Sequence, residues 1–216
     1  AVEKMHREQQ LPPLALVCGP WGSGTSALCS LLNAIGVHAQ GPFYQTNDPR
    51  TPSCFEMLAF NNLVNQLVDE KTLKRRHSSQ FILDQLITFR DQHLIQQGNL
   101  KNQLQLLKTP ASSAILPELQ QVFSLQLLIC LREFKEIEQT RQRRGWPPHL
   151  GQSGAEQIYK QLLNFTASSN SPFLFIRYRD MMDQEHRQQL LSRVSQFLSI
   201  NPSKQQQQHA LKAVTR

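Results

Sequence analysis

One short stretch constrains the fold more than any other: the segment GPWGSGTS, Gly19 to Ser26. The apolar run before it, Leu14 to Val17, is typical of a strand buried on both faces of a parallel sheet. After the glycines, apolar residues from Ala27 to Ile35 recur at helical spacing, and Gly36 is placed to end that helix. The segment therefore predicts a strand, a glycine loop and a helix.

The rest of the chain continues the same alternation. Three further apolar runs predict strands, namely Leu104 to Leu107, Leu125 to Leu131 and Pro172 to Ile176. Six stretches show helical periodicity, namely Phe55 to Val68, Phe81 to Gln97, Ser112 to Phe123, Glu133 to Arg144, Ala155 to Ala167 and Gln188 to Leu198. Between Gly41 and Pro52 the chain is rich in Gly, Pro, Asn and Asp, which predicts a long loop.

Strands that alternate with helices predict a three-layer α/β fold, a mostly parallel sheet with helices on both faces. The 216 residues suit a single domain, and a chain of this length buries roughly 70% of its unfolded surface. We expect one domain over residues 1–216, with a core over about 14–198. A basic, Gln-rich C-terminal tail is expected over 199–216, and its glutamine run, Gln205 to Gln208, is interpreted as a solvated helix or an irregular tail.

Cellular setting is indicated by what the sequence lacks. No apolar run approaches the roughly 20 residues of a membrane span, and the N-terminus shows no apolar core of secretory-signal length. The four cysteines lack CxxC spacing, and two of them lie in apolar runs. Reduced, buried thiols are therefore expected. We predict a cytoplasmic protein without a membrane span.

Charge favours anionic ligands. Lys and Arg exceed Asp and Glu by 23 − 16 = 7. Aromatic residues do not interleave with the basic residues, so no nucleic-acid partner is expected. The clusters Lys71 to His77 and Arg141 to Arg144 have two interpretations, a solvated face or a surface for an anionic glycan.

The glycine loop indicates the chemistry. Gly19 and Gly24 have the GxxxxG spacing of a phosphate loop, whose backbone amides converge on an anion at a helix N-terminus. A nucleoside triphosphatase would have Lys next, whereas this chain has Thr25 and then Ser26. The loop also fits the dinucleotide spacing GxGxxA, although no acidic residue ends a second strand as ribose recognition requires. A plain strand-to-helix turn is the third interpretation. The crowding of Ser23, Thr25 and Ser26 at a helix start favours an anion site in which all three hydroxyls donate.

Five segments in order resemble the sulfotransferase family, and together they cover most of residues 14–198. They are GPWGSGTSALCSLLNAIGV, which resembles the family's SGTSAL loop, PRTPSCFEMLAFNNLVNQL, LLKTPASSAILPELQQVF, LLICLREFKEIEQTRQR and FLFIRYRDMM. The resemblance implies a P-loop NTPase-like sulfotransferase fold. It also implies an enzyme that transfers a sulfuryl group from 3′-phosphoadenosine 5′-phosphosulfate (PAPS) to a hydroxyl or amine. The implied partners are this nucleotide donor and a hydroxylated acceptor, such as a glycan or small metabolite, and no metal is expected.

The resemblance also implies the nucleotide-binding residues. Those from Gly22 through Ser23, Gly24 and Thr25 to Ser26 would hold the 5′-phosphosulfate. Arg132 and Thr140 stand where the family binds the 3′-phosphate with an Arg and a Ser. Arg132 follows a predicted strand and offers a fork of donors, while Thr140 adds a hydroxyl two helical turns on.

Two residues are predicted to act in catalysis. Glu56, in the aromatic-Glu pair of the second segment, is the candidate base for the acceptor proton. Lys108, in the Lys-x-Pro segment, is the candidate cation at the leaving phosphate. His38, His93 and His149 are weaker candidates for the base, and Trp146 is a candidate for the acceptor mouth.

Three departures from the family pattern keep alternatives open. Gly22 replaces a loop arginine, and Thr109 and Ala111 stand where the family has Asp and Arg. A protein that binds PAPS or its bisphosphate product with little or no transfer is therefore the second hypothesis. An atypical P-loop kinase is the third, and the missing loop lysine counts against it.

Overall fold

The computed structural model describes residues 11–49, 51, 53–95 and 103–214. Its centre is a five-stranded sheet in the order β2-β5-β1-β6-β7, with every neighbouring pair parallel. The strands are β1 (Pro13–Cys18), β2 (His38–Ala39), β5 (Gln105–Lys108), β6 (Ser124–Leu131) and β7 (Phe173–Arg177). All four strands expected from the apolar runs are present, and in the described part of this sheet the two-residue edge strand β2 is the one that was not predicted.

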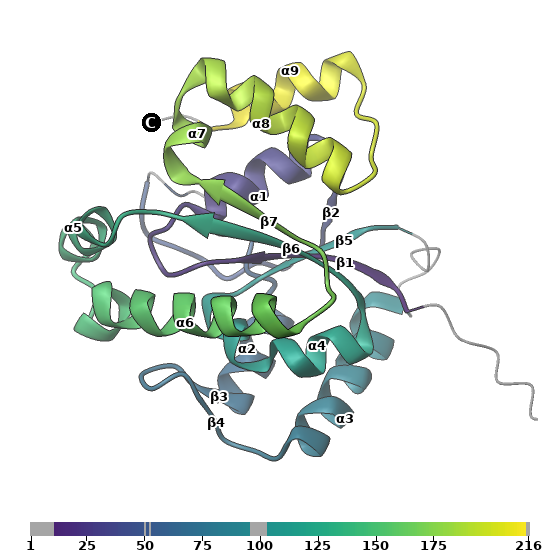
Figure 1. Ribbon diagram of the computed structural model, residues 1–216, viewed down its shortest axis with the longest axis vertical. Helices are drawn as coiled ribbons and strands as arrows, with labels where there is room; N and C mark the ends of the chain where they lie inside the picture. The colour runs from purple at the N-terminus through teal and green to yellow at the C-terminus, as the bar shows by residue number, and fades with distance from the viewer. Residues whose placement is uncertain (1–10, 50, 52, 96–102, 215–216) are drawn as a thin grey trace, which may run out of the picture.

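Helices cover both faces of the sheet, as Figure 1 shows. On one face lie α1 (Thr25–Ala34), α7 (Tyr178–Met182), α8 (Gln184–Phe197) and α9 (Lys204–Ala213). On the other lie α2 (Leu58–Leu67), α3 (Ser79–Phe89), α4 (Leu116–Val122) and α6 (Gln152–Ser168). Each face has its own cluster of buried apolar side chains. The three-layer α/β prediction is confirmed.

Smaller elements join these layers. A two-stranded antiparallel sheet pairs β3 (Val68–Asp69) with β4 (Lys74–Arg75). The helix predicted from Phe81 begins two residues earlier, as α3, and continues into a π-helical stretch, Arg90–Ile95. Its predicted end at Gln97 lies outside the described residues. Between β5 and α4 a 3₁₀ segment spans Pro110–Ile115, and Pro117 occupies the first turn of α4, as Pro requires.

The C-terminal segment forms a helix, one of the two structures expected for its glutamine run. Residues Lys204–Ala213 form α9, which packs on α1 and buries Ala210 completely. Ser203 caps this helix in a reciprocal box with Gln206. The sequence left helix and irregular tail open and did not predict this packing, because a short polar helix depends on a tertiary partner.

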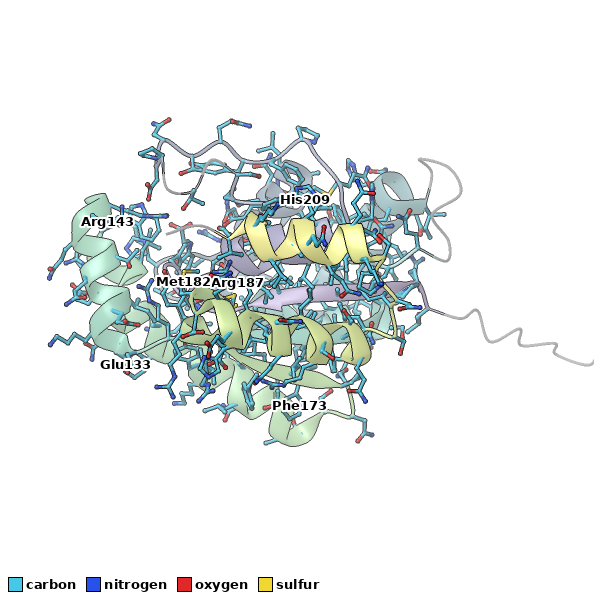
Figure 2. The ribbon with its side chains drawn as sticks, turned by 90° about the horizontal axis from the view of Figure 1, so that it is seen from above. Glu133, Arg143, Phe173, Met182, Arg187 and His209 are labelled. Atoms are coloured by element: carbon cyan, nitrogen blue, oxygen red, sulfur yellow. The ribbon has the colours of Figure 1, made fainter. Side chains whose placement is uncertain are left out.

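A buried arginine ties α8 to its neighbours. Arg187, seen beside Met182 in Figure 2, donates to the carbonyls of Met181, Met182 and Leu211 and is only 8% exposed. The cation therefore lies against the C-terminal turns of α7 and α9, where helix carbonyls lack partners.

We expect Arg187→Met to lower the free energy of unfolding by about 2–4 kcal/mol, because three backbone carbonyls lose a charged donor. Urea denaturation measures the change. Arg193→Met, at an exposed position of the same helix, is the matched control and should change stability by less than about 0.5 kcal/mol. Equal stabilities of the two variants would contradict the stabilising role of Arg187.

The parallel strands bring the candidate site residues to one edge of the sheet. The carboxyl ends of β1, β5, β6 and β7 point the same way in Figure 1, toward α5 (Phe134–Arg144). The chain leaves β1 for β2 and β5 on one side and returns to β6 on the other. Such a switch point leaves a crevice at the carboxyl ends, which is where ligands bind in open α/β sheets. Among the described residues no helix is long and apolar enough to cross a membrane.

Candidate active site

The glycine loop adopts the backbone that its sequence predicted. Gly22 and Gly24 have φ values of 78° and 97°, in the left-handed region, and α1 begins directly after them. A Cβ on Gly24 would stand 2.5 Å from the ring of Tyr178, so the loop needs glycine there for space as well as for conformation. The loop therefore presents backbone amides at a helix N-terminus, the arrangement that binds phosphate.

The three loop hydroxyls do not converge. Ser23 is fully buried, and both its hydroxyl and its backbone N–H donate to the carbonyl of Pro20, at 2.7 and 3.1 Å. Thr25 is buried at the start of α1, while Ser26 faces Lys108. The expectation that all three would donate to one anion thus differs from the structure, in which Ser23 closes the turn.

Lys108 joins the loop to the candidate base. From the end of β5 its ammonium donates to Ser26 Oγ (3.2 Å), to the Cys54 carbonyl (3.0 Å) and to Glu56 Oε1 (2.8 Å). The lysine side chain is only 4% exposed and that of Glu56 only 13%. Three segments distant in sequence thus meet at one buried cation.

The environment keeps this cation charged. Burial by itself lowers the pKa of Lys108, but the Glu56 carboxylate raises it, and the net pKa lies above its ordinary value. The ammonium is therefore protonated at neutral pH. The neighbouring thiols remain neutral, since burial raises the pKa of Cys29 to about 12 and also raises the pKa of Cys54. All four cysteines are free and buried, as predicted.

The segment that carries Glu56 is held in an unusual conformation. Phe55 has a φ of 56°, rare for a bulky residue, and its ring packs on Phe43 at 5.5 Å between centroids. The long loop pairs back onto this segment, where Tyr44 N–H donates to the Glu56 carbonyl at 2.8 Å. Strained residues of this kind cluster at functional sites because only surrounding structure can hold them.

Arg132 and Thr140 also come together. Arg132 donates to Thr140 Oγ1 (3.2 Å) and to the Gly22 carbonyl (2.7 Å), and its guanidinium lies 3.8 Å from the ring centroid of Tyr178. Its Nε pairs with Glu136 at 3.2 Å. The pair predicted to bind the 3′-phosphate thus stands beside the glycine loop and supports it directly.

The three departures are accommodated in different ways. A Cβ on Gly22 would stand 3.1 Å from the Thr140 methyl group, so a longer side chain would crowd this pair. Thr109 and Ala111 are buried, and Ala111 packs in the apolar cluster beneath the sheet. An arginine at that position would place an unpaired charge in the core.

Other candidates lie apart from the Lys108–Glu56 pair. His38 lies in the edge strand β2, His93 stacks on Phe89, and His149 faces Glu70 at 3.4 Å. Trp146 lies under the guanidinium of Arg144, at 4.5 Å from its ring centroid. Its role at an acceptor mouth stays a prediction.

The two basic clusters are largely paired with carboxylates. Five of their arginines form ion pairs, namely Arg75 with Glu118, Arg76 with Asp69, Arg141 with Glu138, and Arg143 and Arg144 with Asp48. In Figure 2, Glu133 and Arg143 mark the two ends of α5. These arginines hold the fold and its long loop, which weakens the interpretation of a free surface for an anionic glycan.

Comparison with known proteins identifies the architecture. No family model and no curated protein matches the chain. Sulfotransferase STF1 from Mycobacterium tuberculosis H37Rv superposes with a TM-score of 0.64 at 14% identity, over 93% of this chain and 71% of that one. The sulfotransferase domain of the Synechococcus PCC 7002 olefin synthase gives 0.54 at 14% identity, over 91% and 77%. The chain has the sulfotransferase fold. The fold expected from the five sequence segments is thereby confirmed.

Three residues that contact the candidate site residues were not predicted from the sequence. Tyr178 stacks on Arg132, Asn61 donates to Glu56, and Tyr159 accepts from the backbone N–H of Arg132 at 3.0 Å. Tyr178 lies two residues after the predicted strand Pro172 to Ile176, which is the signal that could have found it. Asn61 and Tyr159 lie inside helices, where nothing in the local pattern marks them.

Proposed function

We propose that the protein is a PAPS-dependent sulfotransferase, which moves a sulfuryl group to a hydroxyl or amine of an acceptor. The observation that carries the proposal is the meeting of Ser26, Glu56 and Lys108, because it joins a phosphate loop to a cation and a carboxylate. The sulfotransferase fold supports the same conclusion. The loop from Gly22 to Ser26 would hold the 5′-phosphosulfate, mainly through backbone amides.

The proposed chemistry follows from these groups. The acceptor hydroxyl loses its proton to Glu56 as its oxygen bonds to sulfur. The bond between sulfur and the phosphate oxygen breaks, and its electron pair stays on the phosphate. The ammonium of Lys108 stabilises the charge that develops there. Since its three protons are shared among Ser26, Cys54 and Glu56, Lys108 must exchange one partner for the donor.

Arg132 and Thr140 are proposed to bind the 3′-phosphate. A guanidinium offers a fork of donors that matches phosphate oxygens, and the Thr140 hydroxyl stands beside it. A nucleotide with separate 3′ and 5′ phosphates would thus span from Arg132 to the loop. The four free, buried thiols fit a reducing compartment, so we also propose a cytoplasmic location.

A PAPS-binding protein with little turnover is the second candidate. Two observations favour it: the loop lacks the side-chain charge that the family carries at Gly22, and every proton of Lys108 already has an acceptor within the protein. In this alternative the pair of Lys108 and Glu56 would stabilise the fold and would never exchange partners.

Two measurements test the proposal. Calorimetry should find tight binding of adenosine 3′,5′-bisphosphate and much weaker binding of ATP with Mg²⁺. The opposite preference would overturn the proposal and favour the atypical kinase. Transfer of labelled sulfuryl from PAPS to a panel of alcohols, phenols, amines and glycans then separates enzyme from binder, since a binder transfers none.

A further inference from the structure

A buried amide supports the carboxylate of the candidate base. Asn61, in the first turn of α2, donates from Nδ2 to Glu56 Oε2 at 2.6 Å, while Glu56 Oε1 accepts from Lys108 at 2.8 Å. Each carboxylate oxygen thus has its own donor. Because an ionised carboxylate only accepts, Asn61 must turn its NH₂ group toward Glu56.

A hydrogen bond from a second amide fixes the orientation of the Asn61 side chain. Its oxygen accepts from Asn65 Nδ2, one turn further along α2, at 2.7 Å. Asn61 is 9% exposed, whereas Asn65 faces solvent. A row of donors therefore runs from the surface to the buried pair, from Asn65 to Asn61 and on to Glu56.

We propose that Asn61 is the positioning residue of the candidate base, holding Oε2 of Glu56 so that Oε1 faces Lys108 and the phosphate loop. The inference rests on the proposed function. When Lys108 exchanges Glu56 for the donor's phosphate, Oε1 loses its partner and becomes the atom that takes the acceptor proton. The carboxylate keeps its orientation and its ionised form because Asn61 still donates to Oε2.

Among the residues that the structure describes, three titratable groups face Glu56 from other segments. Lys108 comes from β5, the Cys29 thiol from α1 and the Cys54 thiol from the segment before α2. Both thiols are neutral near neutral pH, because burial raises their pKa values. When Lys108 binds the phosphate of PAPS, the amide of Asn61 remains as a hydrogen-bond donor to the ionised Glu56 among the described residues.

The test compares Asn61→Leu and Asn61→Asp with the wild type across pH. Asn61→Leu removes the donor, so the acidic limb of the kcat profile should move up by about one to two pH units, the equivalent of one hydrogen bond to a charged group. At a pH below the wild-type limb, turnover should fall about 10- to 100-fold, and it should recover as the pH rises above the displaced limb. Asn61→Asp should move the limb further, since two adjacent carboxylates share a proton. Binding of the bisphosphate should stay unchanged in both.

Asn62→Leu is the matched control, because Asn62 is exposed on the same helix. It should leave the limb where the wild type has it. A role in packing alone would lower stability without moving the limb, and an unmoved limb in both folded Asn61 variants would overturn the proposal. Asn61→Asp keeps the shape of the side chain and decides the matter if Asn61→Leu does not fold.

A direct titration separates this inference from the proposed function. Carbon-13 NMR of the Glu56 carboxylate follows its protonation midpoint whether or not the protein transfers sulfuryl groups. The midpoint should move to higher pH in both Asn61 variants by about the same interval as the limb. If the wild type transfers nothing, the proposed function fails, while an unchanged midpoint in the variants would refute the role of Asn61.

Discussion

Glu56→Gln should reduce sulfuryl transfer by about 10²- to 10⁴-fold, the range that a general base contributes. The amide keeps the size of the side chain and one acceptor for Lys108, now 2.8 Å from Oε1, so the fold should persist. It has no basic oxygen for the acceptor proton. Steady-state transfer of labelled sulfuryl from PAPS measures the loss, and calorimetry should find binding of the bisphosphate largely unchanged.

The matched control is Glu185→Gln, at an exposed carboxylate of α8. It should transfer like the wild type. A Glu56→Gln variant that retained full transfer would remove Glu56 as the base, and one that also lost the bisphosphate would assign the residue to the nucleotide site.

Arg132→Ala should weaken the bisphosphate about 10- to 100-fold, because one or two hydrogen bonds to a charged phosphate are lost. AMP lacks the 3′-phosphate, so its binding should fall much less. Part of the loss reaches AMP as well, since Arg132 donates to the Gly22 carbonyl at 2.7 Å and thereby supports the loop. Calorimetry with both nucleotides measures the difference.

Thr140→Val separates binding of the 3′-phosphate from support of the glycine loop, because it removes the hydroxyl beside Arg132 and leaves Arg132 in place. It should weaken the bisphosphate and leave AMP unchanged. Arg193→Ala, at an exposed arginine of α8, is the control for charge and should bind both nucleotides normally. Equal losses for AMP and bisphosphate in Arg132→Ala would mean that Arg132 only supports the loop.

Much of the fold could be predicted because its signals are local. The run from Leu14 to Val17, the left-handed glycines and the helix after them form one continuous pattern, and the structure follows it as β1, loop and α1. Asp183, a residue type typical of helix N-caps, accepts from two backbone N–H groups at the start of α8. By contrast, α9 depends on burial of Ala210 against α1, a contact between distant segments that no local pattern records.

The candidate site divides in the same way. Glu56, Lys108, Arg132 and Thr140 were each predicted from the segment around them, and the structure brings them together in two pairs. Ser23 was expected at the anion, whereas its hydroxyl closes the turn onto Pro20. Which hydroxyl of a loop faces outward depends on backbone angles that residue types do not specify.

The sequence by itself determined that a glycine loop would stand between a buried strand and a helix, since glycines and apolar spacing act over neighbouring residues. Tertiary structure alone decided what surrounds that loop. A parallel sheet brings strand ends together from positions far apart in the chain, and so sets Lys108 beside Ser26 and Glu56. It also sets Asn61 behind Glu56 and Tyr178 against Arg132. Contacts of this kind depend on packing across the whole domain, and a local pattern cannot encode them.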